Sequence, residues 1–363
     1  MILFIIILIF VSVSTLVVTY NYLTAPVVAE SSTVIDGKKL VSVLIPARNE
    51  EENIGKCLNF ILAQDYKNIE VLVLNDQSTD RTSEIVKSFS EKHKNIFCFD
   101  GEPLPKEWTG KNWACHQLSQ KARGDYLLFI DADVEPAPET ISSALIIMEA
   151  KKAKMLSVFP TQKIKSFGEW LIVPLMNWLL LSFLPLKNVY SSNNKSFIAA
   201  NGQFMLWERE TYFSIGGHQQ VANAIVEDME LARKAKQQNK IITLLGGNVI
   251  FCHMYNSFLN AFKGFSKNFY PGFNLNPIIF IGFIILLFFF FAVSSVFALT
   301  NSIYLIVVVL IVLSRILISQ MSHQNLFFNV ILHPIQMIIM FVVGINSIMS
   351  TKLRYAAWKG RKL

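Results

Sequence analysis

The segment Tyr126-Leu-Leu-Phe-Ile-Asp-Ala-Asp133 decides the fold that the sequence predicts. Its first five residues form a short apolar run of the strand type, and it ends in two carboxylates spaced as Asp-x-Asp. Two earlier runs, residues 40–45 (LVSVLI) and 69–74 (IEVLVL), have the same apolar character. Residues 50–64 have a helical period, and residues 79–91 also read as a helix. Strands that alternate with helices predict right-handed crossovers and a mainly parallel α/β sheet.

A polar cluster follows each of these three runs: residues 46–51 (PARNEE), residues 75–80 (NDQSTD) and the pair at 131 and 133. Ligands of such sheets bind at the carboxyl ends of the strands, so the three clusters should line one crevice. Helix capping would explain Asn49 or Ser78 taken singly. Capping does not explain two acidic residues at one strand end. Asp131 and Asp133 predict a site for one divalent cation, Mg²⁺ or Mn²⁺, with positions left for phosphate oxygens.

Two motifs outside these clusters also contain charged residues that suit donor binding or catalysis. Lys111, in Trp108-Thr-Gly-Lys-Asn-Trp113, precedes a predicted helix and could meet a diphosphate as a point charge. The surrounding residues do not form a P-loop, and no Gly-x-Gly-x-x-Gly occurs, which argues against a dinucleotide oxidoreductase. Glu227-Asp228 follows Gly216-Gly-His218 and opens a predicted helix over residues 227–238. By itself this pair suits an acidic first helical turn as well as a general base.

The composition predicts a membrane protein. Of the 363 residues, 52% are hydrophobic and 16% are charged, and the mean hydropathy is +0.41, which excludes a disordered chain. Residues 1–22 are uncharged and predict a transmembrane anchor, with a cleaved signal peptide as the alternative. Arg315 is the one charged residue from 268 to 351, and this stretch predicts membrane helices within 277–350. Their apolar blocks lie at about 277–299, 303–319 and 326–349.

Two further segments have distinct predicted places at the membrane. Residues 167–186 (FGEWLIVPLMNWLLLSFLPL) carry one charge and two tryptophans, Trp170 and Trp178. We expect an interfacial or re-entrant segment with its indoles at the lipid boundary, because the motifs on both sides must meet in one site. The net charge of +7 comes mainly from five basic residues in the tail 351–363, and residues 1–267 are nearly neutral. The charge therefore favours contact with anionic lipid and not with nucleic acid.

Taken together, these motifs resemble the family-2 inverting glycosyltransferases with the GT-A fold, over about residues 40–255. The resemblance implies a Rossmann-like GT-A domain over residues 38–267, with the sugar nucleotide and the metal held at the strand ends. Asp133 with Asp131 would meet the metal and ribose, Lys111 would lie near the diphosphate, and Asp228 would be the catalytic base. The residues implied for the base and ribose are Pro46, Arg48, Glu50 and Asp76. Processive relatives carry a Gln-x-x-Arg-Trp motif that this sequence lacks, and its absence argues against polymer synthesis. The nearest counterpart in this chain is Lys267, which could neutralise phosphate.

The layout is similar above all to the bacterial 4,4'-diaponeurosporenoate glycosyltransferases, which glucosylate a carotenoid carboxylate in staphyloxanthin-type pigment synthesis. Shared features include Trp108-Thr-Gly-Lys, Asp131-Ala-Asp-Val134 and His333-Pro334. This resemblance implies an enzyme of the cell membrane that moves one glucose from UDP-glucose to an apolar acceptor, with its catalytic domain in the cytoplasm. A carboxylate acceptor is already ionised near pH 7, so Asp228 would then matter less. Two alternatives stay open: a polyprenyl phosphate, hopanoid or glycerolipid acceptor, and a non-catalytic membrane scaffold or lipid transporter.

Overall fold

The computed structural model describes residues 1–28, 37–353, 357–358 and 361–362. The chain divides into two compact units. The sheet unit comprises residues 26–161, 188–252 and 357–363, and the membrane-helix unit comprises residues 1–25, 162–187 and 253–356. Of the predicted basic tail, residues 351–363, positions 354–356, 359–360 and 363 lie outside the described residues.

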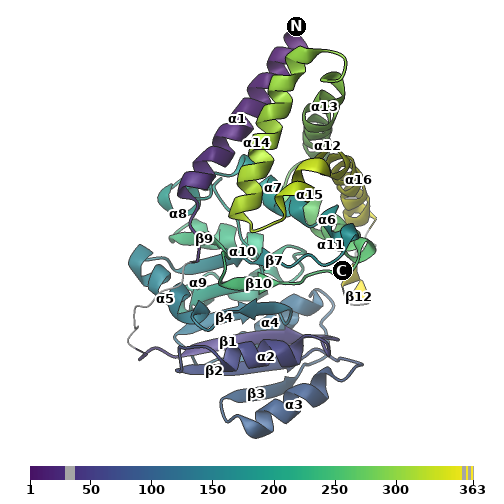
Figure 1. Cartoon of the computed structure of the whole chain (residues 1–363). Helices are drawn as coiled ribbons and strands as arrows, with labels where there is room; N and C mark the ends of the chain where they lie inside the picture. The colour runs from purple at the N-terminus through teal and green to yellow at the C-terminus, as the bar shows by residue number, and fades with distance from the viewer. Residues whose placement is uncertain (29–36, 354–356, 359–360, 363) are drawn as a thin grey trace. The chain divides into compact units, whose positions relative to one another are not determined.

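A seven-stranded sheet in the order β3-β2-β1-β4-β8-β6-β9 forms the core of the sheet unit (Figure 1). Its strands are β1 (Val41–Ala47), β2 (Ile69–Asn75), β3 (Ile96–Asp100), β4 (Tyr126–Ile130), β6 (Met155–Phe159), β8 (Phe204–Glu208) and β9 (Ile241–Leu245). β1 is parallel to both β2 and β4, β2 is parallel to β3, and β6 is parallel to β9. β8 runs antiparallel to β4 and to β6. The predicted mainly parallel α/β sheet is therefore confirmed.

The strand order reverses beside the strand ends at which the sequence predicted a ligand crevice. From β1 the chain winds outward to β2 and β3, whereas β4 returns to the other side of β1. Such a reversal is the point at which ligands bind in open α/β sheets. Every residue of β1, β2 and β4 is buried, which fits strands covered on both faces.

Helices and a smaller sheet complete the sheet unit. Its helices are α2 (Ile54–Leu62), α3 (Thr82–Lys92), α4 (Gly110–Lys121), α5 (Thr140–Lys151), α8 (Asn188–Ser191), α9 (Arg209–Ser214), the 3₁₀ turn η1 (Gly217–Val221) and α10 (Glu227–Lys236). The smaller sheet has the order β5-β10-β7, formed by β5 (Val134–Pro136), β10 (Ile250–Cys252) and β7 (Thr161–Gln162). β10 pairs antiparallel with β5 and sets Cys252 opposite Val134. This pairing brings a thiol to the turn that holds the Asp-x-Asp motif.

Four helices of the membrane-helix unit are long and apolar enough to cross a bilayer. They cover Ile2–Thr24, Pro277–Phe297, Ser302–Met321 and His333–Lys352. The first is α1 (Ile2–Thr24). The second is α12 (Pro277–Leu287) with the π-helical turn η2 (Phe288–Val293) and α13 (Ser294–Phe297), and the third is η3 (Ser302–Tyr304) with α14 (Leu305–Met321). The block expected at 326–349 is divided into α15 (Leu326–Ile331) and α16 (His333–Lys352), because Pro334 lacks an N–H and is accommodated in a first helical turn.

Two segments of the predicted domain 38–267 fall in the membrane-helix unit: residues 162–187 and the chain from 253 onward. They contain α6 (Phe167–Trp170), α7 (Pro174–Phe183) and α11 (Phe258–Phe273). Asn21 of α1 donates from Nδ2 to the carbonyls of Leu181 and Leu184, each at 2.8 Å. Trp178 is 1% exposed and does not lie at a lipid boundary as expected, because its ring packs against Phe291 and His333.

Candidate active site

The loops that follow β1 and β2 are joined by hydrogen bonds. The N–H of Asp76 donates to the carbonyl of Ala47 at 2.8 Å, and Arg48 Nη1 donates to the carbonyl of Asp76 at 2.7 Å. Asn49, whose φ is +52°, accepts the N–H of Thr79 on Oδ1 at 2.8 Å. Asn49 therefore ties the loops together and does not cap a helix. The loop pair contains three of the residues expected to bind the nucleotide, Arg48, Glu50 and Asp76, and the fourth, Pro46, lies near the end of β1.

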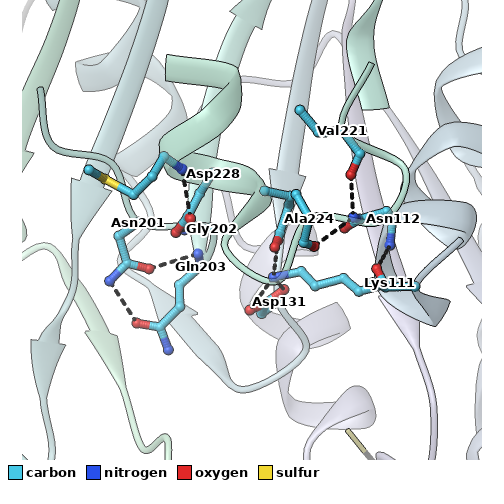
Figure 2. A network of polar contacts seen from close by, with 12 residues as sticks. Lys111, Asn112, Asp131, Asn201, Gly202, Gln203, Val221, Ala224 and Asp228 are labelled. Carbon is cyan, nitrogen blue, oxygen red and sulfur yellow. Dashed lines mark hydrogen bonds and ion pairs between the residues drawn. The ribbon is translucent and has the colours of Figure 1, made fainter. Parts of the chain in front are cut away.

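Lys111 connects two carboxylates at the centre of the site (Figure 2). It lies in the first turn of α4, where the Thr109 hydroxyl caps the helix by accepting the N–H of Asn112. Its Nζ is 3.0 and 3.1 Å from the two oxygens of Asp131 and 3.2 Å from Oε1 of Glu227. Burial alone would lower the pKa of Lys111, but the two carboxylates outweigh it and hold the pKa well above its usual value. Lys111 is thus a stable cation between the end of β4 and the start of α10.

Asp228 is held by two backbone N–H groups. The N–H of Gly202 donates to Oδ2 and the N–H of Met229 donates to Oδ1, both at 2.8 Å (Figure 2). Burial, followed by the charge of Glu227, raises the pKa of Asp228 to about 6, although Lys111 and the two N–H groups oppose the rise. A carboxylate with a pKa close to the working pH is suited to general base catalysis.

Gly202 leaves the space that this arrangement needs. A Cβ at this position would lie 3.1 Å from Nζ of Lys111 and 3.2 Å from Oε1 of Glu227. A larger residue would therefore press on the ion pair while its N–H held Asp228. Our sequence reasoning missed Gly202. The signal that could have found it is a glycine two residues before a strand, because a glycine in such a place often marks a close approach of the backbone.

Asp133 carries a carboxylate oxygen without a hydrogen-bond partner. Its Oδ1 is buried, and no described residue bonds to it. Burial, followed by the charges of Asp131 and Glu50, raises the pKa of Asp133 to about 7. The thiol of Cys252 contacts Asp133 and accepts a hydrogen bond from Gln203 Nε2 at 2.7 Å. A cation bound here would satisfy the unpartnered oxygen and relieve the repulsion among these carboxylates.

Asn112 joins the start of α4 to the loop that leads into α10 (Figure 2). Its Nδ2 donates to the carbonyls of Val221, Ala222 and Ala224 at 2.7, 3.1 and 3.0 Å. Sequence reasoning used this residue only to exclude a P-loop. In the structure it fixes the approach to the Glu-Asp pair relative to Lys111.

The Gly216-Gly-His218 motif is structural. Both glycines have positive φ values, 80° and 51°, so this turn needs residues without a Cβ. His218 is buried, its Nδ1 lies 2.7 Å from the hydroxyl of Tyr212, and burial lowers its pKa to about 3. A histidine held neutral in this way supports the turn through its contact with Tyr212.

The structure thus brings together most of the predicted site residues, but it does not place all of them. Lys111, Asp131 and Asp228 share one network with Glu227, and Asp133 and Glu50 interact electrostatically beside it. Lys267 lies on α11 in the membrane-helix unit. Its role near the diphosphate stays a prediction.

The carboxylates at the end of β4 suit a metal ion that takes only some of its ligands from the protein. Among the described residues, no three His, Cys, Asp or Glu side chains are grouped to hold a metal ion. Mg²⁺ and Mn²⁺ sites that serve phosphate transfer often use one or two carboxylates and fill the other positions with water and substrate oxygens. Asp131 and the unpartnered Oδ1 of Asp133 fit that kind of site.

Comparisons with known proteins agree with this geometry. Residues 42–206 match the family model described as Glycosyl transferase family 2. The 4,4'-diaponeurosporenoate glycosyltransferase of Staphylococcus aureus strain bovine RF122 / ET3-1 is 29% identical over 242 residues, which cover 64% of this chain and 62% of the relative. The protein of the same description from strain USA300 is 28% identical with the same coverage. The match therefore spans less than two thirds of the length of these relatives.

One solved structure shows the same fold. The mannosyltransferase PcManGT from Pyrobaculum calidifontis, in complex with GDP-Man and Mn²⁺, superposes with a TM-score of 0.53 at 18% sequence identity. The superposition covers 75% of each chain. This likeness supports the GT-A type of sheet that the motifs predicted.

Proposed function

We propose that this chain, whose residues 42–206 match the glycosyl transferase family 2 model, is a membrane-bound enzyme of that family that transfers a single hexose with inversion. The donor we infer is a UDP-sugar, in particular UDP-glucose, and the acceptor is an apolar molecule that ends in a carboxylate. The observation that carries the proposal is the network in which Lys111 joins Asp131, on the donor side, to Glu227, beside the candidate base Asp228.

On the donor side, the end of β1 and the loops after β1 and β2 would hold the base and ribose through Pro46, Arg48, Glu50 and Asp76. Lys111 would stabilise negative charge that develops on the departing diphosphate, as fixed cations do in phosphate sites. Asp131 and Asp133 would hold Mg²⁺ or Mn²⁺, which supplies further charge neutralisation at the leaving group. The Mn²⁺ bound to the mannosyltransferase of similar fold is in line with this choice of metal.

On the acceptor side, Asp228 would act on the group that attacks the anomeric carbon. With a pKa of about 6, most of Asp228 is ionised at neutral pH and can accept a proton from a hydroxyl acceptor. A carboxylate acceptor brings no proton to remove. For such an acceptor, the backbone-held Asp228 would position the attacking group and need not act as a base.

The acceptor class rests on the relatives. Both are 4,4'-diaponeurosporenoate glycosyltransferases, and the ending of the acceptor's name denotes a carboxylate. Four helices able to cross a bilayer are in line with an acceptor that is dissolved in the membrane. We therefore propose a carotenoid-type acid as the acceptor.

We further propose that the sheet unit faces the cytoplasm, where sugar nucleotides are made. If all four candidate helices crossed the membrane, the basic tail and the sheet unit would lie on opposite sides. Because basic segments favour the cytoplasmic side, we expect one late segment, near His333-Pro334, to be re-entrant or interfacial. Labelling of a cysteine in the tail by an impermeant reagent added outside intact cells would contradict this topology.

The decisive experiment is transfer by the purified, detergent-solubilised protein. UDP-[¹⁴C]glucose, MnCl₂ and a C30 carotenoid acid are incubated with the enzyme. The products are then separated, and their masses are measured by mass spectrometry. We expect a product heavier by one hexose, with the β configuration at the new bond. The methyl ester of the same acid is the matched control and should not be glycosylated. Absence of any lipid product with all common UDP-sugars, or formation of a polymer, would overturn the proposal.

A further inference from the structure

Arg315 is a buried charge in the membrane-helix unit. It is the one charged residue in the stretch from 268 to 351, and it is 1% exposed near the end of α14. An ionisable residue inside a membrane segment is costly and usually marks a functional site. Its surroundings therefore need an explanation.

The guanidinium group of Arg315 is only partly satisfied. Nε donates to the carbonyl of Asn329 at 3.0 Å, and Nη2 donates to Oε1 of Gln336. Nη1 is buried, and no described residue accepts a hydrogen bond from it. One edge of the group thus binds the protein, and the edge that carries Nη1 does not.

No carboxylate balances this charge among the described residues. The membrane-helix unit contains one acidic residue, Glu169, within its ranges. Glu169 accepts hydrogen bonds from the hydroxyl and the N–H of Ser166 at 2.6 and 3.2 Å, and lies 3.3 Å from Nε2 of His253. A buried cation without a counter-ion is unfavourable, so an anion from outside the chain would stabilise this part of the unit.

His333 adds two more unsatisfied polar atoms beside Arg315. The residue is 2% exposed, and neither ring nitrogen has a partner among the described residues. It lies three positions before Gln336 on α16, so the two side chains share a face of that helix. The charge of Arg315 acts directly on the imidazole of His333. Three unpartnered nitrogens, Nη1 of Arg315 and both ring nitrogens of His333, therefore belong to one buried polar cluster.

The helices around this cluster are interrupted. The ring of Phe291, in the π-helical turn η2, lies 6.0 Å from that of His333, and Trp178 of α7 lies 5.9 Å from it. Leu332 separates α15 from α16 at the same point (Figure 1). π-turns and broken helices in membrane segments are typical of ligand sites. The rings of Trp178 and Phe291 form an apolar wall beside His333, which suits a molecule with a long hydrocarbon chain.

We propose that Arg315 and His333 form a binding site for the carboxylate of an apolar-chain acid within the membrane-helix unit. A carboxylate supplies one negative charge and two coplanar acceptors, which match the unused edge of a guanidinium group. The acid has two possible sources of the same chemistry: the acceptor, bound here before its carboxylate moves on to react, or a fatty acid of the membrane. Only the identification of the acid with the acceptor rests on the function proposed above.

Binding of an acid can be measured without any sugar nucleotide. The full chain is placed in nanodiscs of phosphatidylcholine, and ³H-palmitate is bound and then displaced by unlabelled competitors. We expect palmitate to displace the label at least about tenfold better than its methyl ester, because the ester lacks the charge. Arg315→Gln should abolish this preference and leave the weak binding of the ester unchanged, whereas Arg315→Lys should retain part of it. Lys352→Gln, which removes an exposed cation from the same unit, is the matched control and should behave as the wild type.

The outcomes separate the possibilities. Equal displacement by acid and ester on the wild type, or an unchanged preference in Arg315→Gln, would overturn the site. If Arg315→Gln does not fold, two measurements still test the site. They are the comparison of acid and ester on the wild type and the same comparison on the variant His333→Ala. Stronger displacement by phosphatidylglycerol than by any acid would also overturn it.

Competition with a C30 carotenoid acid then identifies the source. Tighter binding of this acid than of palmitate supports the acceptor, and tighter binding of palmitate supports a membrane fatty acid, while both results support the site. The binding measurement contains no donor, so its result does not depend on whether glucosyl transfer is observed. Loss of the site would likewise leave donor hydrolysis by the sheet unit intact.

Discussion

Replacing Asp133 by Asn should stabilise the metal-free fold while it removes activity. The pKa of Asp133 is raised from 3.8 to about 7, chiefly by burial and then by Asp131 and Glu50. Because the folded value is the higher one, the folded chain binds more protons than the unfolded chain between these two pH values. The stability of the wild type should therefore fall as the pH rises through this window.

The magnitude follows from the shift. Three pKa units correspond to about 4 kcal/mol, which is the largest destabilisation that ionised Asp133 could cause. Because water reaches part of this side chain, we expect about 1–2 kcal/mol to be measurable, or a rise of about 2–6 °C in the Tm of the Asn variant. The physical causes are the burial of the Asp133 side chain and its repulsion by Asp131 and Glu50.

The assay is thermal unfolding followed by tryptophan fluorescence in EDTA, from about pH 4 to about pH 8. Asp133→Asn should melt above the wild type at the alkaline end, and the difference should shrink as the pH falls. Addition of Mn²⁺ and UDP should raise the Tm of the wild type more than that of the variant. Glu91→Gln, at an exposed position of α3, is the matched control. An Asn variant that melts at or below the wild type near pH 8 in EDTA would refute the reasoning.

Three further predictions concern transfer. Asp228→Asn should reduce transfer to a hydroxyl acceptor by about 10²–10⁴-fold and leave the Kd for UDP nearly unchanged; a comparable loss of UDP binding would show that Asp228 is mainly structural. Gly202→Ala should lower both donor affinity and transfer by about tenfold, because its Cβ would press on the neighbouring ion pair. Gly37→Ala, where a Cβ meets nothing within 4 Å, is its control, and equal activity of the two variants would contradict the packing argument. Leu179→Asp should lower transfer to a membrane acceptor while slow hydrolysis of the donor persists, and unchanged transfer would mean that the acceptor uses another route.

Three of the strands and the residues at their ends could be read from local patterns. Short apolar runs at 40–45, 69–74 and 126–130 became β1, β2 and β4, because a buried strand needs only side chains that tolerate burial on both faces. The parallel pairing follows from the helices between them. The predicted first residues of the helices were less accurate. The expected helix at 50–64 begins at Ile54, because residues 49–51 bond to the loop after β2.

Contacts between distant parts of the chain could not be read in this way. Lys111 and Glu227 are far apart in sequence, and so are Gly202 and Asp228, yet each pair meets because β8 is inserted antiparallel beside β4. Likewise, 162–187 and 253–267 join the membrane helices although they lie within the predicted domain.

By itself, then, the sequence determined the sheet, the strand-end carboxylates and the membrane character of the termini, because each depends on the chemistry of neighbouring residues. Only the tertiary structure decided which charges are paired and which are not. Lys111 is balanced by two carboxylates, whereas Oδ1 of Asp133 and Nη1 of Arg315 are buried without a partner among the described residues. The physical reason is that burial and the distances between charges, which set pKa values and binding preferences, are properties of the packed chain.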